Sequence, residues 1–292
     1  MISILIPCYN YNIFPLVSEL FNQCESAGIE YEIIVFNDGG TDFKNENIKI
    51  NSFENTTYIN NGQNIGRTEA RNFLANIATY NWLLFLDADV FPTSSNFIKT
   101  YYETITNYHQ VIVGGCKYKT ESKTDSTILR YKYGIEREQI DAIQRNKNPY
   151  TYILSGNLLI KKEIFIENNF SEQIKYYGMD IFFAYKLMRN KISILHIENP
   201  IYHLGLDQNA VFFDKCLLSV KSRQETLLDK PGIEKINSLI NYYKKIDKLK
   251  MRSIISLFFK LVKPILKRLI LNKNPSLFCL DIYRLGYMCT LK

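Results

Sequence analysis

Short apolar runs alternate with helical patterns over the first two thirds of the chain. The runs at residues 2–7 (ISILIP) and 32–36 (EIIVF) are typical of buried strands. Between them, apolar side chains recur at the i, i+3, i+4 and i+7 spacing of a helix, at Val17, Leu20, Phe21 and Cys24. This alternation predicts an α/β protein with a doubly wound, mostly parallel sheet.

The alternation continues to about residue 205. Further strands are predicted at residues 56–60, 82–86, 109–115, 150–160, 192–197 and 200–205. Further helices are predicted at residues 68–78, 96–107 and 180–190. The charged middle, residues 117–149, is less regular and contains one helical pattern, at residues 128–145.

Polar residues follow three of the predicted strands directly. In open α/β sheets, ligands bind beyond the carboxyl ends of the strands. A single binding site is therefore predicted where these ends meet, and its members are Tyr9, Asn10, Asp38, Gly39, Asp87 and Asp89.

The pair Asp87 and Asp89 follows the apolar run WLLFL. Side chains at i and i+2 of an extended segment point the same way. Magnesium or manganese is often held by one or two carboxylates, with substrate phosphates and water completing the shell. The pair therefore suits a metal that arrives with a diphosphate, although taken alone it would also suit a solvated turn.

Other phosphate-binding motifs are missing. The segment after the first strand, CYNYNIF, contains no glycine, so it lacks the G-x-G-x-x-G dinucleotide fingerprint. The Walker pattern G-x-x-x-x-G-K-[ST] is absent too. A zinc site is not indicated, because no cluster of histidine and cysteine accompanies the two aspartates.

Composition and charge narrow the class of protein. Of the 292 residues, 46% are apolar and 22% charged, which is ordinary for a globular protein. The net charge of +7 is concentrated at residues 244–292, where 12 Lys and Arg face 2 Asp. The rest of the chain is slightly acidic, which argues against nucleic acid as a partner.

The start of the chain and its cysteines predict a cytoplasmic location. The apolar run after Met1 is too short for a secretory signal, and no basic residues precede it. The six cysteines are scattered without a C-x-x-C pair, which fits reduced thiols.

The segment at residues 251–273 is apolar but broken by basic residues. It lacks the uninterrupted apolar stretch that a spanning helix needs. At 100° per residue, three lysines lie on one side, while Ile254, Phe258, Leu261, Ile265 and Leu269 lie on the other. Such a helix suits an anionic membrane surface, although it could also pack on the domain with a solvated lysine face. Pro264 is expected to kink or split it.

The motifs, taken in order, resemble those of inverting family-2 glycosyltransferases with the GT-A fold. The matching pieces are ILIPCYN, EIIVFNDGGTD, NIGRTEARN, LFLDADV, SGNLLI and GMD, over roughly residues 1–205. The resemblance implies a Rossmann-like nucleotide-sugar-binding half at residues 1–115 and an acceptor half at residues 116–212. A helical, basic, amphipathic region is expected at residues 213–292.

The resemblance also implies roles for individual residues. Pro7 and Tyr9 would line the base pocket, and Asp38 would accept a hydrogen bond from the base. The loop and helix at Gly66 and Arg71 would approach the nucleotide. Ribose or metal would be contacted by Asp87, and metal (Mn²⁺ or Mg²⁺) by Asp89. Without a functional role, Tyr9 would be an ordinary loop tyrosine, Asp38 a turn-forming aspartate and Arg71 a surface residue of a helix.

The acceptor half supplies the remaining candidates. Inverting transfer to a hydroxyl needs a general base, and Asp180 is the candidate, although an aspartate there could also cap a helix. The family usually has Glu-Asp at this point, whereas this chain has Met179-Asp180. A third metal ligand could be His203, and Gly156-Asn157 resembles the acceptor-side turn.

The expected function is metal-dependent, inverting transfer of a hexosyl group from a nucleotide diphosphate sugar, with a UDP-sugar expected. The acceptor would be a glycan or glycolipid hydroxyl in surface polysaccharide synthesis, and the enzyme would lie peripherally on the inner face of the cell membrane. Two alternatives remain: a sugar-1-phosphate nucleotidyltransferase, and a catalytically silent nucleotide-sugar-binding protein.

Overall fold

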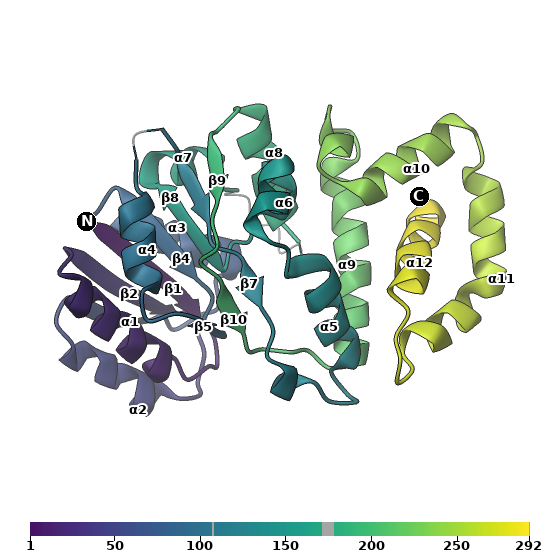
Figure 1. Cartoon of the computed structure of the whole chain (residues 1–292). Coiled ribbons are helices and arrows are strands. Elements are labelled where there is room, and N and C mark those ends of the chain that lie inside the picture. Colours follow the sequence, from purple (N-terminus) through teal and green to yellow (C-terminus); the bar gives the residue numbers. More distant parts are fainter. Residues whose placement is uncertain (107, 171–177, 292) are drawn as a thin grey trace. The chain divides into compact units, whose positions relative to one another are not determined.

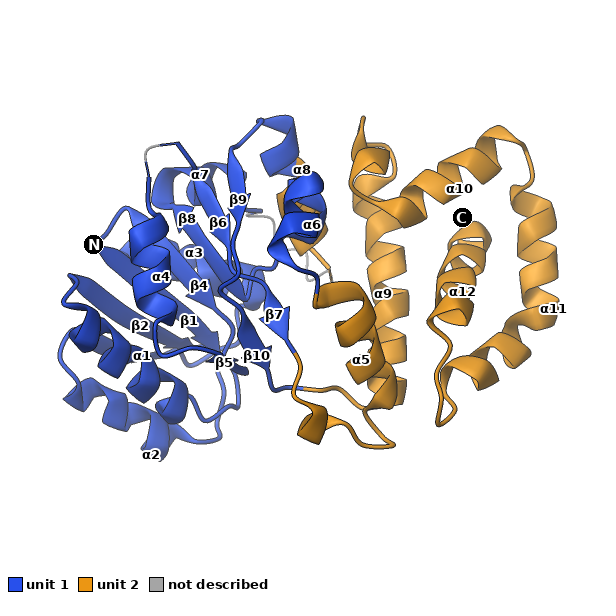
Figure 2. Ribbon diagram, viewed as in Figure 1, with its two compact units in different colours: residues 1–117, 140–173, 186–205 blue, residues 118–139, 174–185, 206–292 orange. Residues whose placement is uncertain are grey.

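The computed structural model describes residues 1–106, 108–170 and 178–291 (Figure 1). The predicted helix end at Asn107 and the last residue of the basic tail, Lys292, lie outside the described residues. The chain forms two compact units, and each is described by itself (Figure 2). Unit 1 comprises residues 1–117, 140–173 and 186–205, and unit 2 comprises residues 118–139, 174–185 and 206–292. The sequence-based division placed a boundary after residue 212. The two compact units divide the chain differently, because residues 118–139 and 174–185 belong to the same unit as the C-terminal helices.

Unit 1 is built on a seven-stranded sheet with the order β3-β2-β1-β4-β8-β6-β9. Neighbouring strands are parallel, except that β8 is antiparallel to both of its neighbours, so the sheet is mostly parallel as predicted. The strands are β1 (Ile2–Cys8), β2 (Tyr31–Asn37), β3 (Thr56–Asn60), β4 (Trp82–Leu86), β6 (Val111–Val113), β8 (Asn157–Lys161) and β9 (Ile194–His196).

The central strands are buried on both faces. Every residue of β4 after Trp82 is buried, as is almost all of β1. Such continuous burial explains why these strands are unbroken apolar runs rather than alternating patterns. The helices of unit 1 are α1 (Phe14–Ala27), α2 (Lys44–Asn47), α3 (Arg67–Ile77), α4 (Phe97–Thr104), α6 (Ala142–Lys147) and α7 (Lys162–Asn168).

Unit 1 also contains a small second sheet, whose first strand begins directly after Asp89. Its order is β5-β10-β7, and the strands are β5 (Val90–Pro92), β7 (Cys116–Lys117) and β10 (Ile201–His203). The strands β5 and β10 run antiparallel, with His203 opposite Val90. This pairing brings a residue from late in the chain beside the segment that follows β4.

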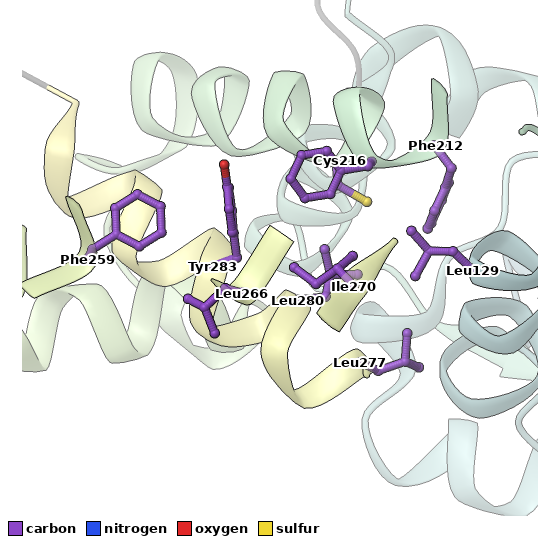
Figure 3. Packing of buried hydrophobic residues seen from close by; sticks show 10 residues of the cluster. Leu129, Phe212, Cys216, Phe259, Leu266, Ile270, Leu277, Leu280 and Tyr283 are labelled. Carbon is purple, nitrogen blue, oxygen red and sulfur yellow. The ribbon is translucent and has the colours of Figure 1, made fainter. Parts of the chain in front are cut away.

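Unit 2 is helical. Its core gathers side chains from four helices, as Figure 3 shows for Phe212, Phe259, Leu266 and Tyr283 among others. The helices are α5 (Ile128–Tyr133), the first part of α8 (Asp180–Arg189), α9 (Asn209–Leu227), α10 (Ser238–Lys248), α11 (Arg252–Ile270) and α12 (Leu277–Thr290). None of the helices in the described part of the chain combines the length and apolar character of a transmembrane span.

One predicted helix differs from the observed structure, whereas the kink expected at Pro264 agrees with it. The pattern at residues 128–145 does not form one helix: α5 passes into a π-helical turn at Gly134–Glu138, and α6 starts separately. The separate start has a local cause, because the Asp141 side chain accepts a hydrogen bond from the Gln144 backbone N–H and so caps α6. Conversely, α11 is not split at Pro264; it continues as one helix, with a bend visible in Figure 1.

Candidate active site

The candidate site lies at the carboxyl ends of three adjacent strands of unit 1. Because β1 pairs with β2 on one side and β4 on the other, the residues that follow them share one edge of the sheet. Tyr9 follows β1, Asp38 follows β2, and Asp87 follows β4. The sheet therefore brings together residues that the sequence separates by up to 78 positions.

Two polar side chains join the loops at this edge. The Asn10 Oδ1 accepts hydrogen bonds from the backbone N–H groups of Thr41 (2.7 Å) and Asp42 (3.2 Å). The Asp38 carboxylate accepts from the backbone N–H groups of Ile65 (2.6 Å) and Gly66 (3.0 Å). The loop before α3 is thus fastened to the end of β2.

This fastening gives Asp38 a structural task. Its side chain is buried, and each of its carboxylate oxygens already accepts one backbone hydrogen bond. Gly66, the N-cap residue of α3, has φ +93°, a conformation that side-chain-bearing residues rarely adopt. Asp38 and Gly66 therefore set where α3 begins and where its arginines point.

Those arginines hold Asp87. The Arg67 Nη2 lies 2.8 Å from Asp87 Oδ2, and the Arg71 Nη2 donates to Asp87 Oδ1. The Arg71 side chain is buried, whereas that of Arg67 is 56% exposed. Burial alone would raise the pKa of Asp87, but the charges of Arg67 and Arg71, with that of His203, outweigh it and lower the pKa below the usual value. Asp87 is therefore an ionised carboxylate that two cations balance.

Asp89 has a different environment. Its Oδ2 lies 3.7 Å from His203 Nε2, and its backbone carbonyl accepts from Leu204 N–H at 2.8 Å. Burial raises the pKa of Asp89; His203 opposes the rise, and the negative charge of Asp87 adds to it. Gly205 packs directly on the carboxylate, because a Cβ there would overlap Asp89 Oδ2. A positive charge close to Asp89 would therefore stabilise the ionised form of its carboxylate.

The acceptor-side candidates lie next to the aspartates but do not share one role. Gly156 packs under Asp87, where a Cβ would meet Oδ2 at 2.5 Å. Asn157 is fully buried, and its amide donates to the carbonyls of Gly115 (2.8 Å) and Asn199 (3.0 Å). Asn157 therefore shapes this turn from inside the sheet rather than by a side-chain contact with a ligand.

The base-pocket candidates follow β1. Tyr9 is 56% exposed, so its ring is accessible to a ligand. Pro7 pairs with Phe36 of β2, but the pairing of β1 with β4 ends before it, at Leu5. Its missing N–H therefore costs no hydrogen bond on the β4 side.

Asp180 is the first residue of α8 and belongs to unit 2, so it is described apart from the other candidates, which all lie in unit 1. It is partly exposed. Its part in catalysis remains a proposal.

Three residues of the site were missed from the sequence. Arg67 stands four positions before Arg71, on the same face of a helix, which was a usable signal. Burial raises the pKa of Tyr11, and the charge of Asp89 raises it further, which indicates that the phenol is near that carboxylate. Gly205 gave no signal, because only the fold brings it against Asp89.

A divalent metal fits Asp89 and His203 better than Asp87. Within the residues that the structure describes, no group of three or more His, Cys, Asp or Glu side chains is placed to hold a metal alone. Asp87 already has two cationic partners, whereas Asp89 has a raised pKa and an imidazole nearby. Oxygen and imidazole donors suit such an ion when a diphosphate and water supply the other ligands.

The sequence matches one family model. The model described as glycosyl transferase family 2 matches residues 3–168, which is more than half of the chain. Among curated proteins, no sequence matches significantly.

Several solved structures are similar to this one. The mannosyltransferase PcManGT from Pyrobaculum calidifontis, in complex with GDP-Man and Mn²⁺, has a TM-score of 0.54 at 14% identity, over 80% of this chain and 66% of that one. S. aureus TarS residues 1–349, in complex with UDP-GlcNAc, have a TM-score of 0.53 at 17% identity, over 97% and 89%. Against a longer TarS chain, the match covers 80% of this chain but only 42% of that one, with a TM-score of 0.51 at 18% identity.

A third protein adds a further example. Glucosyl-3-phosphoglycerate synthase from Mycobacterium tuberculosis, in complex with Mn²⁺, UDP and glucosyl-3-phosphoglycerate, has a TM-score of 0.51 at 13% identity, over 77% of this chain and 79% of that one. At these identities the likeness shows the fold alone. PcManGT and the longer TarS chain are also longer than this protein, which spans two thirds or less of each.

Proposed function

Because the chain belongs to glycosyl transferase family 2 and has the GT-A fold, we propose that it is a metal-dependent, inverting glycosyltransferase. Its donor would be a nucleotide diphosphate sugar, most simply a UDP-sugar, and a hexosyl group would pass to a hydroxyl of a glycan or glycolipid in surface polysaccharide synthesis. A lipid-linked acceptor would place the protein peripherally at the inner face of the cell membrane.

One observation carries this proposal. At the ligand-binding edge of the sheet, Asp87 is balanced by Arg67 and Arg71, while Asp89 lies half-buried beside His203 with a raised pKa. Of the three metal candidates, Asp87, Asp89 and His203, we propose that Asp89 and His203 would hold Mn²⁺ or Mg²⁺, because Asp87 is already paired with Arg67 and Arg71. The similar structures that contain Mn²⁺ support the use of a divalent ion. When bound, the ion would neutralise the charge that develops on the leaving diphosphate.

The donor's nucleotide would lie along the loops after β1 and β2. Tyr9 offers an exposed ring for the base. Asp38 would act through the loop that it fastens, in addition to any hydrogen bond from the base. Arg67, which is half exposed, would contact the diphosphate from the start of α3.

Asp180 would be the general base. In an inverting transfer, the acceptor hydroxyl attacks the anomeric carbon from the face opposite the diphosphate. Asp180 would take the hydroxyl proton as the new C–O bond forms and the bond to the phosphate oxygen breaks. The neighbouring Met179 removes a carboxylate that the family usually has, which is the one feature in favour of a catalytically silent binding protein.

The first test is calorimetric titration of UDP, with and without Mn²⁺, into the wild type, Asp89→Asn and a matched control, Glu103→Gln. Glu103 is an exposed acid on α4 of the same unit. We expect tight binding only with Mn²⁺, unchanged in the control. Asp89→Asn should weaken it at least about tenfold, because even residues that only orient a metal ligand change affinity by that amount.

A second assay separates binding from catalysis. Asp180→Asn should keep UDP binding but lower donor turnover by about 10²–10⁴-fold, the usual contribution of a general base. Binding without hydrolysis or transfer in the wild type would favour the silent binding protein. If UDP, GDP and dTDP all fail to bind with metal present, the donor-site proposal is overturned.

A further inference from the structure

Helix α11 has two apolar sides, and only one of them is buried. Phe259, Leu266 and Ile270 point into the core of unit 2, where Figure 3 shows the first two beside Tyr283 of α12. The opposite side faces solvent. We call it the α11 outer face, and it consists of Ile254, Leu257, Phe258, Leu261, Ile265 and Leu269.

The outer face is unusually exposed for such side chains. Each of the six has 41–71% of its surface accessible. At 100° per residue all six fall within about one third of the helix circumference, so they form a continuous stripe along a helix of 19 residues. Contiguous apolar patches of this kind mark interaction sites, whereas singly scattered apolar residues do not.

Basic residues accompany the stripe. Lys260, Lys263 and Lys267 are exposed and lie on the side of α11 away from the outer face, where Lys267 Nζ is 5.7 Å from the centre of the Phe213 ring. Arg268 lies within the outer face. The helix contains no acidic residue at all. Unit 2 as a whole carries 23 Lys and Arg against 12 Asp and Glu, a net charge of +11.

The apolar and basic residues of α11 indicate which kind of partner it binds. An apolar stripe that contains Arg268, in a unit with a net charge of +11, matches the boundary between acyl chains and anionic headgroups, where apolar side chains insert and basic groups meet phosphates. A second copy of this chain fits poorly, because two copies of unit 2, each with a net charge of +11 and no acid on α11, would repel each other.

We propose that the α11 outer face docks on the surface of a membrane that contains anionic lipids. The helix would lie in the plane of the interface, with Phe258 and Leu261 among the inserted side chains. The inference names the surface behind the membrane location proposed above, and its test does not depend on the transfer reaction.

The test is sedimentation of the full chain with vesicles of phosphatidylcholine mixed with phosphatidylglycerol, and with vesicles of phosphatidylcholine alone. The wild type should bind the anionic vesicles and bind the neutral ones much more weakly. The double variant Phe258→Ser/Leu261→Ser should bind the anionic vesicles at least tenfold more weakly. Its control is Ile143→Ser, which removes an equally exposed apolar residue from α6 and should bind as the wild type does.

The basic residues are tested separately. Lys260→Gln/Lys263→Gln/Lys267→Gln should weaken binding by up to about 100-fold, which is the limit of roughly a fivefold factor for each basic residue close to an anionic surface. Lys44→Gln/Lys49→Gln/Lys147→Gln removes the same charge from exposed positions of unit 1 and should have a much smaller effect. Circular dichroism would establish that each variant is folded.

Three outcomes would overturn the proposal. The first is a wild type that does not bind anionic vesicles. The second is equal binding by the wild type and the α11 variants. The third is a wild-type dimer in sedimentation velocity that Phe258→Ser/Leu261→Ser converts to a monomer, which would assign the outer face to a second copy. Loss of UDP binding in Asp89→Asn with vesicle binding intact would separate the two proposals.

Discussion

Two aspartates that stand two positions apart have opposite electrostatic environments. Asp87 is balanced by Arg67 and Arg71, and its pKa is lowered, whereas burial and the proximity of Asp87 raise the pKa of Asp89. The difference arises because α3 supplies cations to one carboxylate and β10 supplies only His203 to the other. We therefore assign positioning to Asp87 and cation binding to Asp89.

Removal of Arg71 should destabilise unit 1. Arg71→Gln removes the buried cationic partner of the partly buried Asp87 carboxylate, so we expect a loss of up to about 3 kcal/mol in the free energy of unfolding, as for other broken buried pairs. Arg67→Gln breaks an exposed pair and should cost less than about 1 kcal/mol. Urea unfolding followed by the fluorescence of Trp82, the only tryptophan, reports on the strand that precedes Asp87. Equal losses in both variants would contradict this division.

A buried histidine outside the site makes unit 1 sensitive to acid. His196 Nε2 lies 2.9 Å from the Pro149 carbonyl, and Arg145 Nη1 lies 3.0 Å from its Nδ1. The network assigns the proton to Nε2 and makes Nδ1 the acceptor from Arg145. The pKa of His196 is lowered to about 4, mainly by burial and also by the Arg145 charge, against the opposing effect of the hydrogen bond to Pro149.

The consequence for stability has a definite sign. The folded pKa is lower than the value of 6.5 for a free histidine, so the contribution is complete above about pH 6.5 and is lost as the pH falls toward about 4. The resulting loss in the free energy of unfolding should approach about 3 kcal/mol. In His196→Gln, the free energy of unfolding should be lower at neutral pH but should change less over this window. Urea unfolding at several pH values gives the pH dependence of the free energy of unfolding for the wild type and for His196→Gln. The same pH dependence in both proteins would refute the assignment.

At the scale of elements, one glycine sets how closely two helices of unit 2 approach. Gly286 of α12 faces the Phe259 ring of α11, and a Cβ at that position would overlap the ring. Phe259 in turn packs edge-on against Tyr283, with ring centroids 5.0 Å apart. The α11–α12 pair that carries the outer face thus depends on a residue without a side chain.

Gly286→Ala should therefore lower stability although alanine favours helices. We expect a net loss of about 1–2 kcal/mol, because overpacking costs more than the gain in helix propensity. Gly62→Ala is the control, since no atom lies within 4 Å of its added Cβ. Adding Phe259→Leu should relieve the overlap, so the double variant should lose less than the sum of the single losses. Additive losses in thermal unfolding, followed by circular dichroism, would exclude this contact as the cause.

At the scale of the whole molecule, charge is divided between the units. Unit 1 carries 13 Lys and Arg against 17 Asp and Glu, a net charge of −4, and unit 2 carries +11. The excess positive charge thus belongs to the unit with the α11 outer face. A phosphate-rich surface would attract unit 2 and weakly repel unit 1.

This division predicts a salt dependence. Binding of the full chain to phosphatidylglycerol-containing vesicles should weaken steadily as sodium chloride is added, because screening shortens the reach of the exposed lysines. Binding of UDP with Mn²⁺ should change less, since that contact is local and partly buried. Vesicle binding that is indifferent to salt would point to the apolar stripe alone.

The sequence alone determined which segments form the sheet and where its polar ends lie. Buried parallel strands must be continuous apolar runs, so β1, β2 and β4 could be located, and with them Tyr9, Asp38, Asp87 and Asp89. The amphipathic pattern of α11 was readable for the same reason, because a helix repeats its faces every 3.6 residues.

Only the tertiary structure decided which of these residues meet. The antiparallel pairing of β10 with β5 places His203 and Gly205 at Asp89, although more than 110 residues separate them in the chain. No local pattern encodes such a pairing, because it arises from packing between distant segments. Likewise, the pattern of α11 separated a lysine side from an apolar side, but only the packing showed that Phe259, Leu266 and Ile270 are buried while the predicted apolar side stays in water.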